Sequence, residues 1–399
     1  MADFAAEVRR LMEERGMSLR GLARAAHYDP SHLSKVLNGH KPASPYLAAR
    51  LDDALDAGGT LMALVSRRTV LTGAAAIAAT PLLGTLDAER LQWAQRHPPR
   101  IDSGVVESLA DVLAAQRRAE DSVGPRAIMK PVLAQLAEIE ELVRQARGPL
   151  RPALVEVAQQ WAQYGAYLHR DNGNPAGDRT LLSQALEWAE EVGDRTMAAT
   201  VLVQRGNMAL AAGELGTVIG LAQAAQRDKT VDAGQRADAA DLEARAHAQA
   251  GDAAAAERKI DETAELAGHL TERAEDRHPW LYWMTPAFFE CARGAVFGLL
   301  ADEPRYRARA IAALETGYAG LPSDQRSSAW TAPTLARLAG VHVRAGDVEE
   351  ASAVALQCAD IAQLTGSVRL CGMLTDLHAG MAARWPGDPR VAELAEALR

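Results

Sequence analysis

Four polar or basic side chains share the outward face of one predicted helix near the start of the chain. The helix covers residues 30–37, and its inward positions are Leu33, Val36 and Leu37. Because residues three and four apart lie on the same face of a helix, the outward face carries the remaining hydrogen-bonding residues. These are Ser31, His32, Ser34 and Lys35. Hydroxyl, imidazole and ammonium groups exposed in this way could hydrogen-bond to DNA.

Three further helices are predicted to hold that face in place. Apolar residues recur at helical spacing over residues 3–15, and Gly16 ends this first helix. Ser18 caps the second helix, and Asp29 caps the third. Ser44 caps the fourth helix. The fourth helix is expected to bury Leu47, Leu51 and Leu55.

Residues 3–60 resemble the phage-repressor family of helix-turn-helix proteins, also called Cro/C1 or XRE. The resemblance is carried by Ser18-Leu19-Arg20-Gly21-Leu22-Ala23, by the segment from Ser31 to Gly39, and by Pro42. In that family the third helix lies in the major groove, so the resemblance implies that this chain reads base pairs there. The implied base-reading residues are Ser31, His32, Ser34 and Lys35.

The same resemblance implies phosphate contacts from the start of the second helix and from the loop after the third. The implied contact residues are Ser18, Arg20, Asn38, His40 and Lys41. Two positions depart from the family pattern. Leu19 stands where several members have glutamine, and His27 stands where glycine is common.

Charge is distributed unevenly along the chain. The net charge of the 399 residues is −9, which does not suggest a nucleic-acid partner. Residues 1–68, however, hold ten Lys and Arg against eight Asp and Glu, whereas the remainder holds 33 against 44. We therefore expect a DNA-binding domain over residues 1–65 and an acidic body behind it.

Residues 66–102 are predicted to form an apolar linker helix. It begins with Ser66-Arg67-Arg68-Thr69-Val70-Leu71, which resembles a twin-arginine export signal, and no charge follows until Asp87. A start at Met62 would place this motif near an N-terminus. Because the motif follows a complete DNA-binding fold and Pro81 interrupts the segment, we expect a cytoplasmic protein. Export or membrane association is the alternative.

Residues 103–399 are predicted to form a series of helical hairpins. Turn glycines stand at Gly173, Gly213, Gly251 and Gly346. The residue seven places before each is small, which lets a partner helix approach closely: Ala166, Gly206, Ala244 and Ala339. A further hairpin is expected to turn near Ala301, giving about five or six hairpins in all. The whole chain is thus predicted to be all-α, a four- to five-helix bundle followed by an α-solenoid.

The hairpins resemble degenerate tetratricopeptide (TPR) repeats, although most of the signature Trp and Tyr positions are lost. The complete layout resembles actinobacterial regulators with a Cro/C1-type head and a TPR-like body. That resemblance implies transcription control by a ligand, peptide or protein partner, with the body used for sensing and dimerisation. Regulators of similar layout often hold a peptide backbone with asparagines on the concave face. Of the four asparagines in this chain only Asn207 is well placed for that role, so the sequence gives peptide sensing of this kind little support.

An aromatic cluster interrupts this aromatic-poor chain, in which Phe, Trp and Tyr make up 5% of the residues. It contains Trp280, Tyr282, Trp283, Phe288 and Phe289. Such a concentration could form a small-molecule pocket or a dimer interface, or it could fill the core of a longer hairpin.

Nothing in the sequence indicates catalysis. The chain has no phosphate-binding glycine loop, no HExxH motif and no nucleophile elbow, so we expect neither an enzyme nor a cofactor. His169, His247 and His342 fall on separate hairpins and are expected to pack rather than to bind a metal ion. The three cysteines lack metal-type spacing and are expected to be buried thiols.

We therefore expect a homodimeric, sequence-specific transcription regulator whose two heads contact half-sites about one DNA turn apart. A different hypothesis is a scaffold, in which the repeats recruit a protein partner and the head only locates it on DNA.

Overall fold

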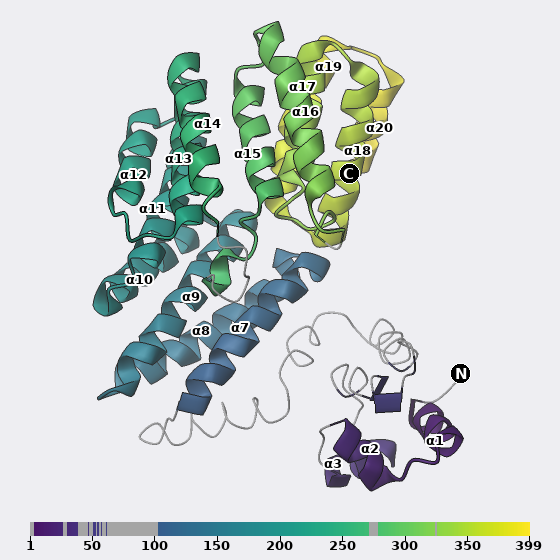
Figure 1. Cartoon of the computed structure of the whole chain (residues 1–399). Coiled ribbons are helices and arrows are strands. Elements are labelled where there is room, and N and C mark those ends of the chain that lie inside the picture. The colour runs from purple at the N-terminus through teal and green to yellow at the C-terminus, as the bar shows by residue number, and fades with distance from the viewer. Residues whose placement is uncertain are drawn as a thin grey trace. The chain divides into compact units, whose positions relative to one another are not determined.

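The computed structural model describes residues 4–26, 30–38, 47, 51–52, 54–55, 57, 61, 103–270, 278–323 and 325–399. The chain divides into two compact units, Met1–Trp93 and Ala94–Arg399 (Figure 1). The described residues form helices and turns without strands, as predicted.

The first unit contains the predicted helices of the helix-turn-helix. They are α1 (Phe4–Glu14), α2 (Leu19–Ala25) and α3 (Pro30–Leu37). Gly16 follows α1 with a φ of +59°, and the Ser18 hydroxyl accepts a hydrogen bond of 3.1 Å from the backbone N–H of Gly21. The helix end and the N-cap expected from the sequence are therefore both present.

One apolar cluster joins the helices of the first unit. Its members from α1 to α3 include Val8, Leu22 and Leu33, and later residues complete it: Leu47, Leu51, Leu55 and Leu61. The Arg9 guanidinium donates hydrogen bonds to the backbone carbonyl of Leu37 and to Asn38 Oδ1. Because the last carbonyls of a helix lack intrahelical partners, this contact fixes the end of α3 to α1.

Several predicted features lie outside the described residues. They are the turn at His27 to Asp29, the end of the third helix at Gly39, the cap at Ser44 and the linker helix of residues 66–102. Among the helices that are described, none is both long and apolar enough to cross a membrane.

The second unit is a stack of helices that pack chiefly with their neighbours in the chain (Figure 1). The helices are α7 (Ser103–Val123), α8 (Pro125–Gln145), α9 (Leu150–Asp171), α10 (Pro175–Val192), α11 (Arg195–Ala211), α12 (Leu215–Arg227), α13 (Ala233–Gln249), α14 (Ala253–Ala267), α15 (Pro286–Leu299), α16 (Pro304–Gly320), α17 (Pro333–Ala345), α18 (Val348–Thr365), α19 (Val368–Arg384) and α20 (Pro389–Ala397). A short 3₁₀ helix, η3 (Pro279–Leu281), precedes α15.

The helical hairpins turn at the glycines, as the sequence predicted. Backbone φ angles of +73°, +74°, +80° and +85° occur at Gly173, Gly213, Gly251 and Gly346, a region that favours glycine. The fifth hairpin, α15 and α16, turns between Leu299 and Pro304, as expected. The small residues seven places before the glycines allow close packing: a Cβ at position 206 would lie 2.5 Å from Leu242 Cδ2.

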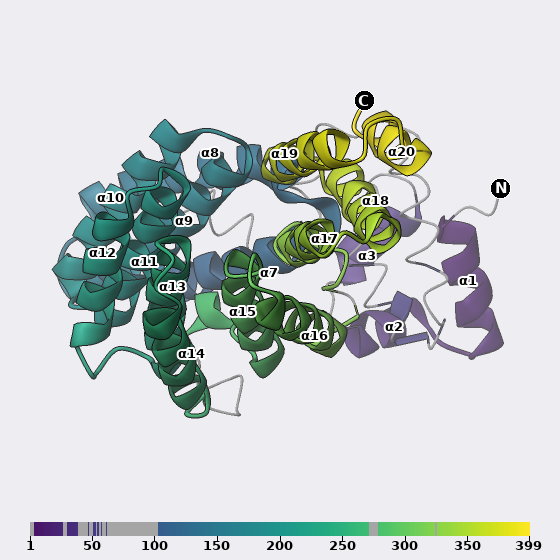
Figure 2. The same cartoon turned by 90° about the horizontal axis from the view of Figure 1, so that it is seen from above.

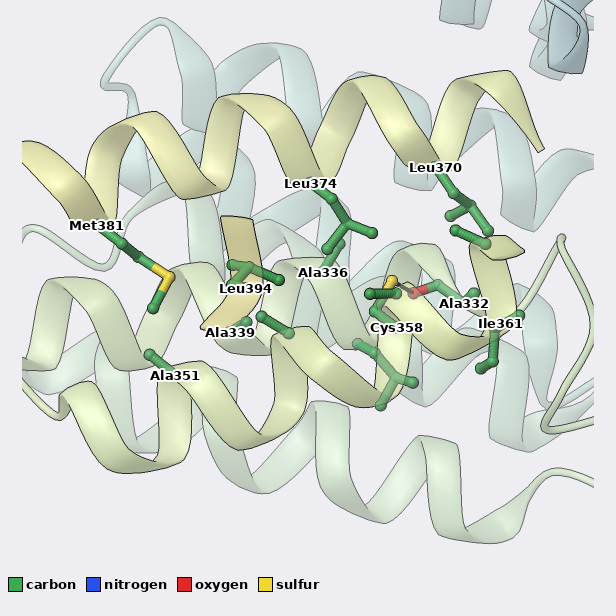
Figure 3. Packing of buried hydrophobic residues seen from close by; sticks show 14 of the residues in the cluster. Ala332, Ala336, Ala339, Ala351, Cys358, Ile361, Leu370, Leu374, Met381 and Leu394 are labelled. Atoms are coloured by element: carbon green, nitrogen blue, oxygen red, sulfur yellow. Dashed lines mark hydrogen bonds between the residues drawn. The ribbon is translucent and has the colours of Figure 1, made fainter. Parts of the chain in front are cut away.

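Alanine-rich contacts make the last hairpins compact. Figure 3 shows Ala332, Ala336 and Ala339 facing α18, while Leu370 and Leu374 of α19 cover the same core. The buried Cys358 thiol donates a hydrogen bond of 3.4 Å to the backbone carbonyl of Ala332. Small side chains therefore set the helix spacing in this part of the chain.

The second unit closes on itself, which the sequence did not reveal. Figure 2 shows the last helices returning to the first ones, and α18 contacts α7 while α19 contacts α9. Arg369 Nε lies 3.0 Å from Asp171 Oδ1, and Trp330 Nε1 donates a 2.8 Å hydrogen bond to Asp121 Oδ1. A Cβ at Gly124 would come within 2.1 Å of the carbonyl oxygen of Thr365.

Candidate functional site

The outward face of α3 is the first candidate site. Lys35 is exposed and Ser34 is partly exposed, while Leu33, Val36 and Leu37 are buried as predicted. The backbone of α3 also includes Ser31 and His32, whose side chains lie outside the described residues. A basic side chain is thus available to a partner along one side of a helix that is anchored on the other.

The predicted phosphate contacts fall into two groups around α2 and α3. Ser18 and Arg20 are exposed at the start of α2, where the Ser18 oxygen also caps the helix. Asn38 is exposed after α3, and its amide donates a 3.4 Å hydrogen bond to Ser34 Oγ. His40 and Lys41 lie outside the described residues.

The second candidate site is a partly open cavity of about 1400 Å³ between the helices of the second unit. It exceeds the roughly 300–1,000 Å³ typical of small-molecule pockets. Side chains from α7, α9, α11, α13, α15, α17 and α19 line it, so residues more than 200 positions apart in the chain contribute to the same cavity. The closure between α19 and α9 is what brings the first and last of these helices together.

Part of the aromatic cluster lines this cavity. Trp280, Tyr282, Trp283 and Phe288 are all on its surface, whereas Phe289 is buried in an apolar core with Met197 and Ala198. Trp280 belongs to the same core. The cluster therefore lies partly in the core and partly on the cavity surface, because η3 and the start of α15 pass between the two.

Trp283 and Phe288 of this cluster, together with Trp330 from the segment before α17, form the aromatic wall of the cavity. The Trp283 ring lies 4.6 Å from Phe288 in an edge-to-face arrangement and 6.4 Å from Trp330, measured between centroids. Trp283 Nε1 donates a 2.9 Å hydrogen bond to the carbonyl of Trp280, which fixes the ring. A flat apolar molecule could stack against such a surface.

Charged side chains line the rest of the cavity. The arginines are Arg117, Arg170, Arg179, Arg205, Arg245, Arg337 and Arg369. The carboxylates are Glu120, Asp171, Asp178, Glu214, Asp238 and Asp241. Three ion pairs involve these groups: Arg170 with Asp178 at 2.8 Å, Arg245 with Asp241 at 2.8 Å, and Arg369 with Asp171 at 3.0 Å.

Two of the remaining carboxyl groups favour their protonated forms. Burial and, to a lesser extent, the neighbouring Asp121 carboxylate raise the pKa of Glu120 to about 8, while a 3.2 Å hydrogen bond from Tyr167 opposes the shift. Burial likewise raises the pKa of Asp238 to about 7. Neither group fully balances an arginine near neutral pH.

Arg117 and Arg337 are the cavity cations whose protonated forms are most disfavoured. Burial lowers the pKa of Arg117 to about 10, and its guanidinium donates to the Gln160 carbonyl at 3.3 Å rather than to a carboxylate. Loss of solvation also lowers the pKa of Arg337 to about 10, and the nearby charges of Arg245 and Arg369 add to that effect. Both groups remain cationic at neutral pH.

The three predicted packing histidines occupy different environments. His342 is buried, whereas His169 and His247 are partly exposed. Asn174 Nδ2 lies 3.0 Å from His169 Nδ1, and His247 Nε2 lies 3.8 Å from Glu243 Oε1. The residues that the structure describes hold no cluster of His, Cys, Asp and Glu suited to a metal ion. Cys291 and Cys358 are buried, but Cys371 is exposed, contrary to expectation.

Sequence reasoning did not identify the charged residues of the cavity. A usable signal was present on α13, where Asp238, Asp241 and Arg245 recur at helical spacing in an otherwise alanine-rich helix. Asn207, expected on the concave face, does line the cavity and accepts a 2.9 Å hydrogen bond from Arg245 Nη1. It is therefore already engaged by the protein.

Comparison with known families identifies the first unit only. Residues 3–65 match the family model described as a helix-turn-helix domain. This match supports a DNA-binding regulator with DNA as a partner. No curated protein matches the chain.

Proposed function

We propose that this protein is a sequence-specific transcription regulator of the XRE type, whose TPR-like body senses an effector. The observation that carries the proposal is the helix-turn-helix match over residues 3–65, together with the exposed basic side chain of Lys35 on α3. We place the domain boundaries at residues 1–65, 66–102 and 103–399. The protein would act in the cytoplasm, at the nucleoid.

In this proposal α3 enters the major groove. Ser31, His32, Ser34 and Lys35 meet base edges, while the residues around Ser18 and Asn38 contact phosphates. The Arg9 contact with Leu37 and Asn38 supports this geometry, because it fixes the end of α3 relative to α1.

A single head offers weak electrostatic attraction, because residues 1–68 carry a net charge of only +2. Two linked heads would bind far more tightly than one, so we propose a homodimer assembled through the acidic body. The large cavity supports effector sensing, because its concave lining combines aromatic and charged side chains that suit a small-molecule ligand.

Capture and sequencing of genomic DNA with the full-length protein tests the proposal. We expect a small set of enriched sites that share a two-fold symmetric motif. Lys35→Ala should weaken binding to the best site by about 1–3 kcal/mol, because it removes a groove contact without disturbing the buried face of α3.

The matched control is Lys229→Ala, which removes an exposed lysine from the loop after α12. It should leave DNA affinity unchanged, as measured by fluorescence anisotropy at a fixed salt concentration. Absence of enriched sites, together with unchanged affinity in Lys35→Ala, would exclude sequence-specific regulation by this head.

A further inference from the structure

We propose that the cavity of the second unit binds a small organic anion with a flat apolar body, whose anionic group is held by Arg337. The flat body lies against the aromatic wall of Trp283, Phe288 and Trp330. This inference rests on the proposed function, because it names the chemical class of the effector.

Arg337 is a cavity cation that the protein leaves open to a ligand beside the aromatic wall. It belongs to α17, and its side chain lines the cavity, where it is accessible although the surrounding protein desolvates the guanidinium. Among the described residues it has neither an ion-pair partner nor a hydrogen-bond partner, whereas its neighbours Arg245 and Arg369 each contact a carboxylate. A guanidinium offers a planar fork of donors that matches a carboxylate or a phosphate.

The carboxyl groups of the cavity do not neutralise this cation. Asp171, Asp178 and Asp241 are each paired with another arginine, although Asp241 also acts electrostatically on Arg337. Glu214 is exposed at the start of α12. Glu120 and Asp238 are buried, and burial favours their uncharged forms. The cavity is therefore locally cationic within a body of residues 69–399 that carries 33 basic and 44 acidic residues. An anion would balance that local charge.

The position of α15 relates the anion site to the aromatic wall. Phe288, Cys291 and Ala295 line the cavity at helical spacing, so one face of α15 runs along it. Arg337 acts electrostatically on Cys291, which lies one turn beyond Phe288. Because α15 also packs against α17, which carries Arg337, the wall and the guanidinium lie on adjacent helices of the same cavity lining. One molecule with an acidic group beside a fused ring could reach both.

Isothermal titration of the full-length protein with 2-naphthoate and 2-naphthamide tests this site. The two probes share the ring system and differ in charge. We expect 2-naphthoate to bind about 10-fold or more tightly than 2-naphthamide, because only the carboxylate forms charge-assisted hydrogen bonds with Arg337. A parallel titration with 2-naphthyl phosphate shows which kind of anion the site prefers.

Variants then locate the binding. Arg337→Gln should weaken 2-naphthoate binding about 10-fold or more and leave 2-naphthamide binding unchanged. Trp283→Leu should weaken both probes to a similar extent. Arg258→Gln is the matched control, because it removes an exposed arginine of α14 that does not line the cavity, and it should change neither affinity.

Three results would overturn the inference. They are equal affinity for the charged and uncharged probes, undiminished 2-naphthoate binding in Arg337→Gln, and no binding of any probe at millimolar concentration. Thermal unfolding of each variant confirms that it is folded. The titrations contain no DNA, so their failure is distinguishable from failure of the head to recognise an operator.

Discussion

Glu120 shows how burial within the cavity changes the chemistry of a single residue. Only about 2% of its surface is exposed, and Asp121 and Asp171 add negative charge nearby. These surroundings hold its pKa near 8, above the value of 4.5 for an unperturbed glutamate. The folded protein therefore keeps a proton that the unfolded chain releases, and folding becomes less favourable as pH rises from about 4.5 to about 8.

Replacement of Glu120 by glutamine should remove this pH dependence. A glutamine side chain can still accept the hydrogen bond from Tyr167, but it cannot ionise. We expect Glu120→Gln to match the parent near pH 5 and to exceed it by roughly 1–3 kcal/mol of unfolding free energy at pH 9. Urea unfolding followed by circular dichroism measures both values.

The exposed Glu156 provides the control for this substitution. Glu156→Gln should alter stability little and equally at the two pH values. A Glu120→Gln protein that gains nothing at pH 9 would show that Glu120 is ionised in the folded state at neutral pH.

At the scale of elements, the turn between α7 and α8 packs closely against the end of α18, where the second unit closes on itself. Gly124 has φ +81° and ψ 160°, a backbone conformation essentially restricted to glycine. Its Cα also faces the backbone of Thr365 at the end of α18. A side chain at position 124 would strain the turn between α7 and α8 and push this turn away from the end of α18.

Gly124→Ala should therefore destabilise the protein by about 3 kcal/mol or more. Gly148→Ala is the matched control: Gly148 also has a positive φ, of +69°, but no atom lies within 4 Å of the added Cβ. Gly148→Ala should lower the free energy of unfolding by only about 1–2 kcal/mol. The difference between their urea midpoints measures the packing of α7 and α8 against α18, and equal losses would contradict that packing.

At the scale of the second unit, an ion pair between residues 198 positions apart joins the two ends of the solenoid. Asp171 is fully buried, while Arg369 is partly exposed and also donates a 3.3 Å hydrogen bond to the carbonyl of Ala329. An unpaired buried carboxylate is costly, so the pair makes an open arrangement of the repeats unfavourable. It also keeps the opposite walls of the cavity together.

A double-mutant cycle with Arg369→Gln and Asp171→Asn should give a coupling energy of about 2 kcal/mol in urea unfolding. The exposed pair Arg305 and Glu303, whose atoms lie 2.9 Å apart, serves as the control. Its cycle should give less than about 0.5 kcal/mol, because solvent screens the interaction. A coupling energy near zero for Arg369 and Asp171 would mean that α19 does not pack against α9 in solution.

The sequence by itself determined the elements of this protein. The N-cap of α2, the apolar periods of α1 to α3, and the hairpin turns at glycines such as Gly173 and Gly346 were predictable because each depends on residues within one or two helical turns. It also identified the aromatic segment around Trp283, although its pattern did not distinguish core from cavity. The matching of Lys35 and its neighbours to base pairs remains a prediction.

Only the tertiary structure decided where the ends of the solenoid meet and which charges face inward. Arg117, Arg337 and Arg369 come from helices far apart in the chain, and each looks like an ordinary surface arginine in its local pattern. Small rotations between successive hairpins accumulate over the whole stack, and no single repeat specifies their sum. Closure, and with it the cavity and the open position of Arg337, is therefore a property of the assembled repeats.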